Sequence, residues 1–200
     1  FADQLLGAIN ADADNKYYDV WGVHSYHSGA APESGDRWKR NMDFRAQQAV
    51  LTGLLEKHGQ ISQNADGTVE KDVSRWTTEI GYSASASEER MYASWMTRLL
   101  ALNFMGDAYG PYHDKFIIYA LFNHGFDKAA DSENTYGIVN NWENEYWYKQ
   151  SAYAAKESYL TVAQWNKMMN GAKFVKADIE EKSGGYVNGD EVFTVGNYNF

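Results

Sequence analysis

Three strand-like segments, each followed by a loop and a helix-like segment, constrain the fold most strongly. The segments cover residues 18–27, 75–82 and 116–123 and are rich in aromatic, β-branched and apolar side chains. The third segment is almost wholly apolar, which is typical of a parallel strand buried on both faces. Helical spacing of apolar residues follows over residues 38–58 and 85–106. Gly59 and Gly106 are expected to end these helices, and Ser85 and Glu88 have the spacing of a capping box that opens the second. Strands that alternate with helices of this length form β/α units around a parallel sheet. The expected fold class is therefore α/β.

The number of visible β/α units favours part of a (β/α)8 TIM barrel. A complete barrel typically needs about 250 residues, and this chain has 200. A leading helix is expected over residues 1–10, and a last one over residues 149–169. We expect residues 1–171 to be the C-terminal part of such a barrel. A small open α/β sheet is the alternative, but the sequence has no Gly-rich phosphate loop of the kind such folds use.

The last residues, 172–200, have a different pattern. Residues 173–182 alternate apolar and polar side chains, and a second short strand follows Asn188-Gly189. This alternation is typical of antiparallel strands. We expect this segment to lie outside the barrel as the start of a small accessory β-sheet.

Charge and cysteine content exclude several classes of function. Eighteen basic and twenty-seven acidic residues give a net charge of −9, which argues against nucleic acid or an anionic membrane surface as a partner. The absence of cysteine excludes disulfides, thiolate zinc sites and cysteine nucleophiles. No apolar run approaches the length of a membrane span. A metal site at His24 and His27 is disfavoured because residues three apart on a strand point to opposite faces.

The carboxyl end of the second strand carries the first candidate for chemistry, Glu79. Catalytic side chains sit at the carboxyl ends of parallel strands in α/β folds, and Glu79 is followed closely by Gly81. On the first strand the period of two places His24 and Tyr26 on one face, so both are expected to reach the same edge. The alternative for Glu79 is a structural acid paired with a barrel Arg or Lys, and Arg75 is near at hand.

Five motifs occur in a characteristic order along the chain. They are Asp-Val-Trp-Gly-Val-His-Ser-Tyr at 19–26, Trp-Thr-Thr-Glu-Ile-Gly-Tyr at 76–82, Tyr-Ala-Leu-Phe-Asn at 119–123, Tyr-Gly-Ile-Val at 136–139 and Lys-Gln-Ser-Ala-Tyr at 149–153. Together they resemble the last three β/α units of glycoside hydrolase clan A. The similarity is greatest to barrels of family 39 and related bacterial exopolysaccharide hydrolases, and it covers about residues 1–170.

The resemblance implies a retaining glycosidase with Glu79 as the nucleophile. It implies that His24 and Tyr26 hold the sugar and the nucleophile, that a carbohydrate is the partner, and that no metal or cofactor is needed. It also implies a secreted or periplasmic location. The further candidates for contact with the sugar are His27, Tyr82, Tyr119, Phe122, His124 and Trp142.

Two departures from the clan's pattern bear on function. The clan's acid/base glutamate follows an asparagine at the end of strand four, but Asn144-Glu145, the one such pair here, lies after the last strand. The acid/base is therefore expected outside the given residues, in an N-terminal half that precedes them or forms a separate chain. Strand eight often places a tryptophan beneath the sugar, and here Ile118, Tyr119 and Phe122 occupy that region. A non-catalytic carbohydrate-binding or scaffold protein is the second hypothesis.

Several loop residues leave two interpretations open. His124 and Asp127 are either rim contacts or partners in loop hydrogen bonds, and Trp142 and Trp147 either stack on sugars or cover the helical layer. The net acidity disfavours an anionic sugar unless local cations compensate. The candidates for that compensation are Arg37, Lys39 and Arg40. Tyr92, Trp95 and Met96 are assigned to the core.

Overall fold

The computed structural model describes residues 1–12, 17–27, 29–35, 42–125, 127–141, 152–173, 182–188 and 191–197. Its helices are α1 (Ala2–Asn10), α2 (Phe44–Lys57), α3 (Glu89–Met105), the 3-10 helix η2 (Ser132–Thr135) and α5 (Glu157–Met169). Its strands are β1 (Val20–Val23), β2 (Ser62–Gln63), β3 (Val69–Lys71), β4 (Ser74–Ile80), β5 (Lys115–Ile118), β6 (Lys182–Asn188) and β7 (Glu191–Asn197).

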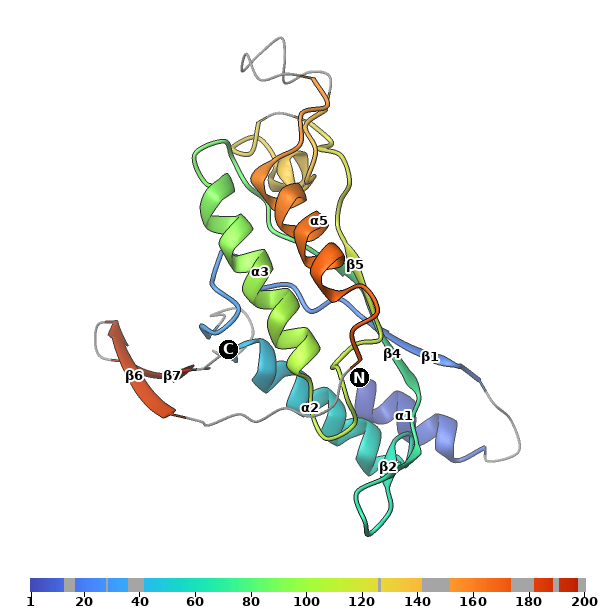
Figure 1. The fold of residues 1–200 in the computed structure, drawn as a ribbon. Coiled ribbons are helices and arrows are strands. Elements are labelled where there is room, and N and C mark those ends of the chain that lie inside the picture. The colour runs from blue at the N-terminus through green and yellow to red at the C-terminus, as the bar shows by residue number, and fades with distance from the viewer. Residues whose placement is uncertain are drawn as a thin grey trace.

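β1, β4 and β5 form a three-stranded parallel sheet with β4 in the centre (Figure 1). The register places Gly22 beside Trp76 and Thr77 beside Phe116. Helix α2 connects β1 to β4 and α3 connects β4 to β5, as parallel neighbours require. The predicted α/β class with parallel β/α units is confirmed. These three strands do not close into a barrel.

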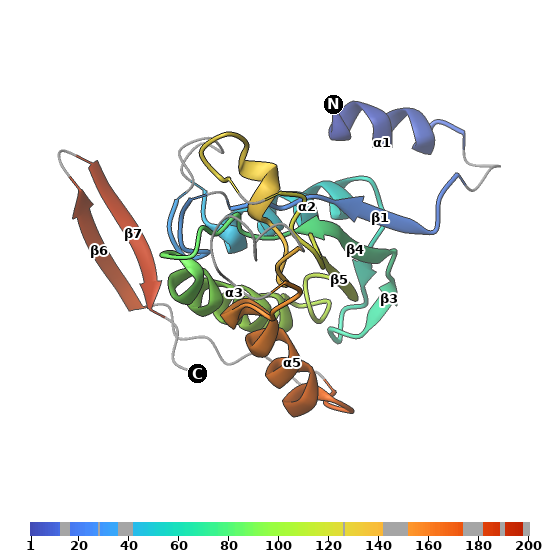
Figure 2. The same ribbon diagram turned by 90° about the horizontal axis from the view of Figure 1, so that it is seen from above.

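One face of the sheet is covered by helices. Ile80 of β4 and Leu99 of α3 belong to the main cluster of buried apolar residues, and Trp165 of α5 packs against that cluster. Figures 1 and 2 show α3 and α5 side by side. The predicted core assignment is confirmed for three residues, of which two are buried in this cluster and one packs at its edge: Tyr92, Met96 and Trp95.

The opposite face of the sheet is exposed, so the burial expected for the third strand is wrong. We expected an apolar strand buried on both faces, but β5 ends at Ile118 and alternates between exposed and half-buried residues. Ile117 is 48% exposed. Gly22 and Thr78 lie on this same face, since a Cβ on Gly22 would stand 3.3 Å from Cγ2 of Thr78. In the described part of the chain, helices therefore cover only one side of these strands.

The helices begin later than predicted and end where predicted. Helix α2 begins at Phe44 rather than near residue 38, because Oδ1 of Asp43 accepts a hydrogen bond from the Ala46 amide at 2.7 Å. The predicted stop at Gly59 is confirmed by its positive φ of 61° just after the His58 cap. Helix α5 begins at Glu157, later than the predicted residue 149, which lies outside the described residues.

Helix α3 shows the same combination of a later start and a confirmed stop. The Ser85 amide donates to Oε2 of Glu88 at 2.9 Å, which is half of the predicted capping box, but the regular helix begins at Glu89. The helix ends at Met105 and is capped by Gly106 with φ 61°. None of the helices in the described ranges is long and apolar enough to cross a membrane.

Two antiparallel hairpins accompany the sheet. The turn at residues 64–67 joins β2 to β3, a hairpin that the sequence did not reveal. Strands β6 and β7 pair along their whole length, from Lys182 opposite Asn197 to Asn188 opposite Glu191. The second of these strands follows Asn188-Gly189 as predicted, whereas β6 begins at Lys182, where the first predicted strand was expected to end. Residues 174–181 of that predicted strand lie outside the described residues. The division into a barrel part and an accessory part stays a prediction.

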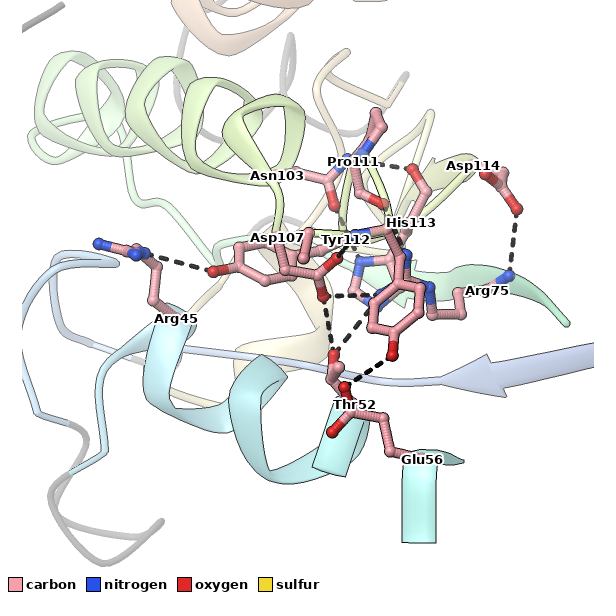
Figure 3. A network of polar contacts seen from close by, with 12 residues as sticks. Arg45, Thr52, Glu56, Arg75, Asn103, Asp107, Pro111, Tyr112, His113 and Asp114 are labelled. Atoms are coloured by element: carbon pink, nitrogen blue, oxygen red, sulfur yellow. Dashed lines mark hydrogen bonds and ion pairs between the residues drawn. The ribbon is translucent and has the colours of Figure 1, made fainter. Parts of the chain in front are cut away.

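A buried polar network ties the start of β4 to α2 and to the end of α3 (Figure 3). Nη1 of Arg75 donates to Oδ2 of Asp107 at 2.9 Å, and the same oxygen accepts from the Thr52 hydroxyl at 2.8 Å. Both partners of this ion pair are largely buried. Asp107 rather than Glu79 is therefore the carboxylate that pairs with Arg75. The alternative interpretation of Glu79 as a structural partner of Arg75 is wrong.

His113, in the same network, gives the fold an acid-sensitive point. Its Nδ1 lies 2.9 Å from the Thr77 hydroxyl and 2.9 Å from Oδ1 of Asn103. Burial, and to a smaller extent the nearby charge of Arg75, lower the pKa of His113 to about 3. The folded protein therefore holds this ring neutral where an unfolded chain, with a histidine pKa of 6.5, binds a proton.

The free energy of unfolding should fall as the pH decreases from about 6.5, the pKa of histidine in the unfolded chain, to about 3, its pKa in the folded protein. Its slope should reach at most about 1.4 kcal/mol per pH unit from this one group, because only the unfolded state gains the proton between the two pKa values. Denaturant titrations at a series of pH values measure the slope. In the His113→Gln variant the slope should be smaller by that amount, and an identical slope in both proteins would contradict the assignment.

Candidate active site

An irregularity near the end of β4 turns Glu79 away from the helix-covered face. The buried residues of the strand are Arg75, Thr77 and Ile80, so their spacing changes from two to three. The pairing with β5 shifts register over the same interval, between Thr77 and Ile80. Such shifts re-aim the side chains beside them. The Glu79 side chain is 29% exposed and follows the exposed Thr78.

Two donors from the segment after β1 hydrogen-bond to Glu79. Nδ1 of His24 lies 2.8 Å from Oε2 of Glu79. A carboxylate only accepts hydrogen bonds, so this nitrogen carries the proton. The Tyr26 hydroxyl donates a second bond to the same carboxylate. The predicted proximity of these three residues is confirmed.

The protonation state of the Tyr26 hydroxyl suits a hydrogen-bond donor. Burial raises the pKa of Tyr26 well above its usual value, and the negative charge of Glu79 raises it further. The phenol therefore stays protonated across the physiological range. The two donors thus fix the orientation of the Glu79 carboxylate.

Removing the phenol should weaken catalysis more than folding. In a protein that hydrolyses glycosides through Glu79, we expect Tyr26→Phe to lower kcat/KM about 10- to 100-fold, because a hydrogen bond to a charged group contributes about 1.5–3 kcal/mol. Steady-state kinetics and thermal unfolding measure the two effects. Tyr159→Phe, on the exposed surface of α5, is the matched control and should change neither. Unchanged kinetics in Tyr26→Phe would contradict the role of this donor.

A row of three tyrosine rings lies beside Glu79. The centroids of Tyr26 and Tyr136 are 5.7 Å apart, and those of Tyr136 and Tyr119 are 5.5 Å apart. Tyr119 follows β5, and the peptide bond between Tyr119 and Ala120 is cis. The charge of Glu79 acts on both Tyr26 and Tyr119. Aromatic faces of this kind suit the apolar faces of sugar rings.

A second carboxylate, Glu133, stands at the far end of this row. Its Oε2 accepts a hydrogen bond from the Tyr119 hydroxyl at 3.0 Å. His124 lies at the same place, with Nδ1 3.4 Å from that hydroxyl and its ring perpendicular to the Tyr119 ring. Burial raises the pKa of Tyr119, and its bond to Glu133 raises it further. Tyr119 therefore stays protonated and connects His124 and Glu133 to the tyrosine row.

Two glycines allow these segments to approach each other. A Cβ on Gly81 would stand 2.0 Å from the carbonyl oxygen of Tyr119. A Cβ on Gly137 would stand 2.0 Å from the Asn123 amide nitrogen. Both contacts are with backbone, which cannot rotate away. Glycine at these positions is therefore what lets Tyr119 and Tyr136 lie next to the end of β4.

Comparison with known proteins gives a match at the level of the fold. The structure of a family 39 glycoside hydrolase from the gut symbiont Bacteroides cellulosilyticus WH2 superposes with a TM-score of 0.57 over 93% of this chain. The chain is similar in fold to part of a family 39 glycoside hydrolase. It spans 32% of that structure, at 17% sequence identity. No protein-family model and no curated protein matches the sequence.

This match confirms the predicted resemblance in its structural sense. The likeness covers nearly the whole chain and a partial set of the β/α units of the family 39 enzyme. At 17% identity it establishes a shared fold and does not establish shared catalytic residues. The role of each side chain therefore depends on the geometry described above.

Two residues expected to contact the sugar are buried instead. His27 is fully buried, and its ring bonds to the Ser34 carbonyl and, at 3.0 Å, to Nε2 of Gln47. Tyr82 is buried and stacks on the ring of Tyr92 at 5.3 Å. Side chains this deeply buried offer no surface to a sugar. We therefore assign both to the protein interior.

Phe122 and the loop residues have separate outcomes. Phe122 is exposed and its ring centroid lies 6.0 Å from that of Tyr153, so its contact with a sugar stays a prediction. Oδ1 of Asp127 accepts from the Ala129 amide at 2.9 Å, which is the loop hydrogen bond weighed for it. Five residues lie outside the described ranges, so their suggested roles stay predictions: Trp142, Trp147, Arg37, Lys39 and Arg40.

Two residues of the site had no role in the sequence interpretation. Tyr136 opens one of the five motifs, so its place in the chain was noted but its contact with Tyr26 was not foreseen. Glu133 lies in a polar segment with no pattern that marks it, and only the turn of η2 brings it to Tyr119. In the described part of the chain no group of three or more histidine or acidic side chains could hold a metal ion.

Proposed function

We propose that this chain supplies the nucleophile of a retaining glycoside hydrolase that cleaves O-glycosidic bonds in a polysaccharide or oligosaccharide. One observation carries the proposal: Glu79, at the carboxyl end of a central parallel strand, accepts hydrogen bonds from both His24 and Tyr26. The fold, which resembles part of a family 39 glycoside hydrolase, supports it.

The chemistry assigned to Glu79 follows from this arrangement. Its free oxygen attacks the anomeric carbon as the glycosidic bond breaks, and a second carboxyl group protonates the departing oxygen. That second group then takes a proton from water, which attacks the glycosyl-enzyme and releases the carboxylate. His24 and Tyr26 keep their bonds to Glu79 and hold it in line. No metal or cofactor takes part in this proposal.

We propose that the acid/base glutamate belongs to β/α units beyond these 200 residues, in the same polypeptide or in a separate chain. The chain spans 32% of the family 39 structure it resembles, which supports this. The outer strands β1 and β5 leave room for further strands to pair, and Ile117 on the uncovered face is available for packing. Together such units would close the expected barrel.

The second candidate function is carbohydrate binding without hydrolysis. It is favoured by the sequence, which has its one Asn-Glu pair at 144–145, after the last of the expected strands. The tyrosine row and Glu79 could bind a sugar without a catalytic acid. The two functions differ in whether the bound glycoside is cleaved.

Product stereochemistry tests the proposal. The longest natural polypeptide that contains this sequence would be incubated with a panel of aryl glycosides, and NMR would follow the anomeric proton of the first product. We expect the configuration of the substrate to be retained. An inverted product would overturn the nucleophile assignment. Binding without cleavage across the panel would favour the second function.

A further inference from the structure

Lys156 is a buried lysine just before helix α5. Only 2% of its surface is exposed. Its ammonium group donates to Oδ1 of Asn123 at 2.9 Å, to the carbonyl of Thr135 at 3.1 Å and to the carbonyl of Ala84 at 3.5 Å. An ammonium group has three N–H donors. Each of them therefore has a partner.

The three acceptors belong to the three segments that carry the candidate site. Ala84 lies shortly after the β4 end that bears Glu79. Asn123 follows β5 and Tyr119. Thr135 is the last residue of η2, between Glu133 and Tyr136. One side chain thus joins the backbone or side chains of all three segments from the interior side.

The same segments also bond to each other around Lys156. The Ala84 amide donates to the Thr135 carbonyl at 3.1 Å, and the Ser83 hydroxyl lies 2.8 Å from that of Thr135. The Lys156 amide itself donates to the carbonyl of Ile138 at 2.9 Å. The lysine is the point where these bonds converge.

Keeping a cation at this place is unfavourable by itself. Burial is the main cause that lowers the pKa of Lys156; Glu89 of α3 opposes it, the positive charge of Lys128 adds to it, and the resulting pKa is about 8. Its three bonds described above all go to neutral oxygens, with no carboxylate among the acceptors. A buried ammonium without an ion-pair partner costs folding free energy. An apolar side chain would avoid that cost, so the lysine points to a requirement for its three donors.

We propose that Lys156 is a positioning residue for the candidate active site. It holds the segment after β4, the segment after β5 and η2 together, so that Tyr119, Tyr136 and Glu133 lie beside Glu79. The effect on turnover rests on the proposed function. The effect on the geometry of the tyrosine row does not depend on it.

Kinetics of the complete protein test the first effect. Lys156→Met removes all three donors, and we expect kcat/KM to fall about 100-fold, as for a displacement of site groups by about 1 Å. Lys156→Gln keeps donors without the charge and should lose less. Lys167→Met, an exposed lysine on the same helix, is the charge control, and Leu99→Ala, in the core, controls for lost stability. An equal loss of kcat/KM in Leu99→Ala and Lys156→Met, at equal melting temperature, would overturn the positioning role.

NMR tests the second effect and does not need enzymatic activity. The ring signals of Tyr119 and Tyr136 should shift in wild type as the pH passes the value at which Lys156 loses its proton. Tyr119 does not itself ionise there, because its pKa is raised. In Lys156→Gln the shift should disappear, while it should persist in Lys167→Met. If wild type shows no hydrolysis but these shifts occur, the proposed function fails and the positioning inference stands. If neither the pH titration nor the Lys156 substitution changes the tyrosine ring signals, the inference is overturned.

Discussion

Under the proposed function, replacing Glu79 with glutamine should abolish turnover in the complete protein and leave its fold and sugar binding largely intact. Glutamine has nearly the same shape as glutamate but cannot attack the anomeric carbon as an anion. Loss of a nucleophile typically lowers kcat by about ten-thousandfold or more. Hydrolysis of an aryl glycoside with a good leaving group measures the loss, and calorimetric titration with an oligosaccharide measures binding.

The matched control for this variant is Glu157→Gln at the exposed start of α5. It changes the net charge by the same amount and should keep normal kinetics. Near-normal turnover in Glu79→Gln would show that another group performs the attack. Loss of both turnover and sugar binding would point to a damaged site rather than a missing nucleophile.

Adding a methyl group at Gly81 should disrupt both stability and the site. In Gly81→Ala the new Cβ would stand 2.0 Å from the carbonyl oxygen of Tyr119, so the ends of β4 and β5 must separate. Overpacking of this kind typically costs about 1–3 kcal/mol or more. The Tyr119 side of the tyrosine row should move with the backbone. Thermal and denaturant unfolding measure the loss of stability.

Gly53→Ala is the matched control for the same change of residue. Gly53 lies inside α2, and a Cβ there would have no atom within 4 Å. Because alanine favours the helix over glycine, we expect a gain of up to about 1 kcal/mol. Gly81→Ala with the stability of wild type would contradict the close approach of β4 and β5 described here.

The sequence predicted the order of the β/α units and the central group of the site. Apolar strand-like segments alternate with helix-like segments, and this pattern predicts a parallel sheet. The carboxyl ends of its strands, which lie far apart in the chain, meet at one edge of that sheet. Glu79, His24 and Tyr26 were expected together for this reason, and the structure places them in hydrogen-bond contact. The order of the five motifs added the likeness to a family 39 barrel.

The face of the sheet to which each side chain of β4 points could not be predicted from its residues. Strict alternation would place Glu79 on the face of Thr77, which is covered by helices. The shift before Ile80 changes the faces, so Ile80 and Tyr82 point to the helical layer and Glu79 does not. This is why Tyr82, expected beside the sugar, stacks on Tyr92 instead. Pairing with β5 determines the shift, and a pattern within one strand does not contain it.

Contacts between distant loops could not be predicted from the sequence either. Glu133 and Lys156 lie in segments without strong periodicity, and their roles depend on bonds to Tyr119 and to Asn123 that only the folded chain creates. The exposure of β5 could not be foreseen for a related reason. An apolar strand predicts a partner surface on both faces, and the described part of the chain supplies one on a single face.

Trapping the covalent intermediate tests the central claim most directly. A fluorinated glycoside with an activated leaving group forms the glycosyl-enzyme of a retaining hydrolase faster than water can remove it. Mass spectrometry of the labelled protein, followed by peptide mapping, then locates the sugar. The account predicts one glycosyl group attached to the Glu79 side chain, and no label in Glu79→Gln. A label on another carboxylate would contradict the assignment of Glu79 as the nucleophile.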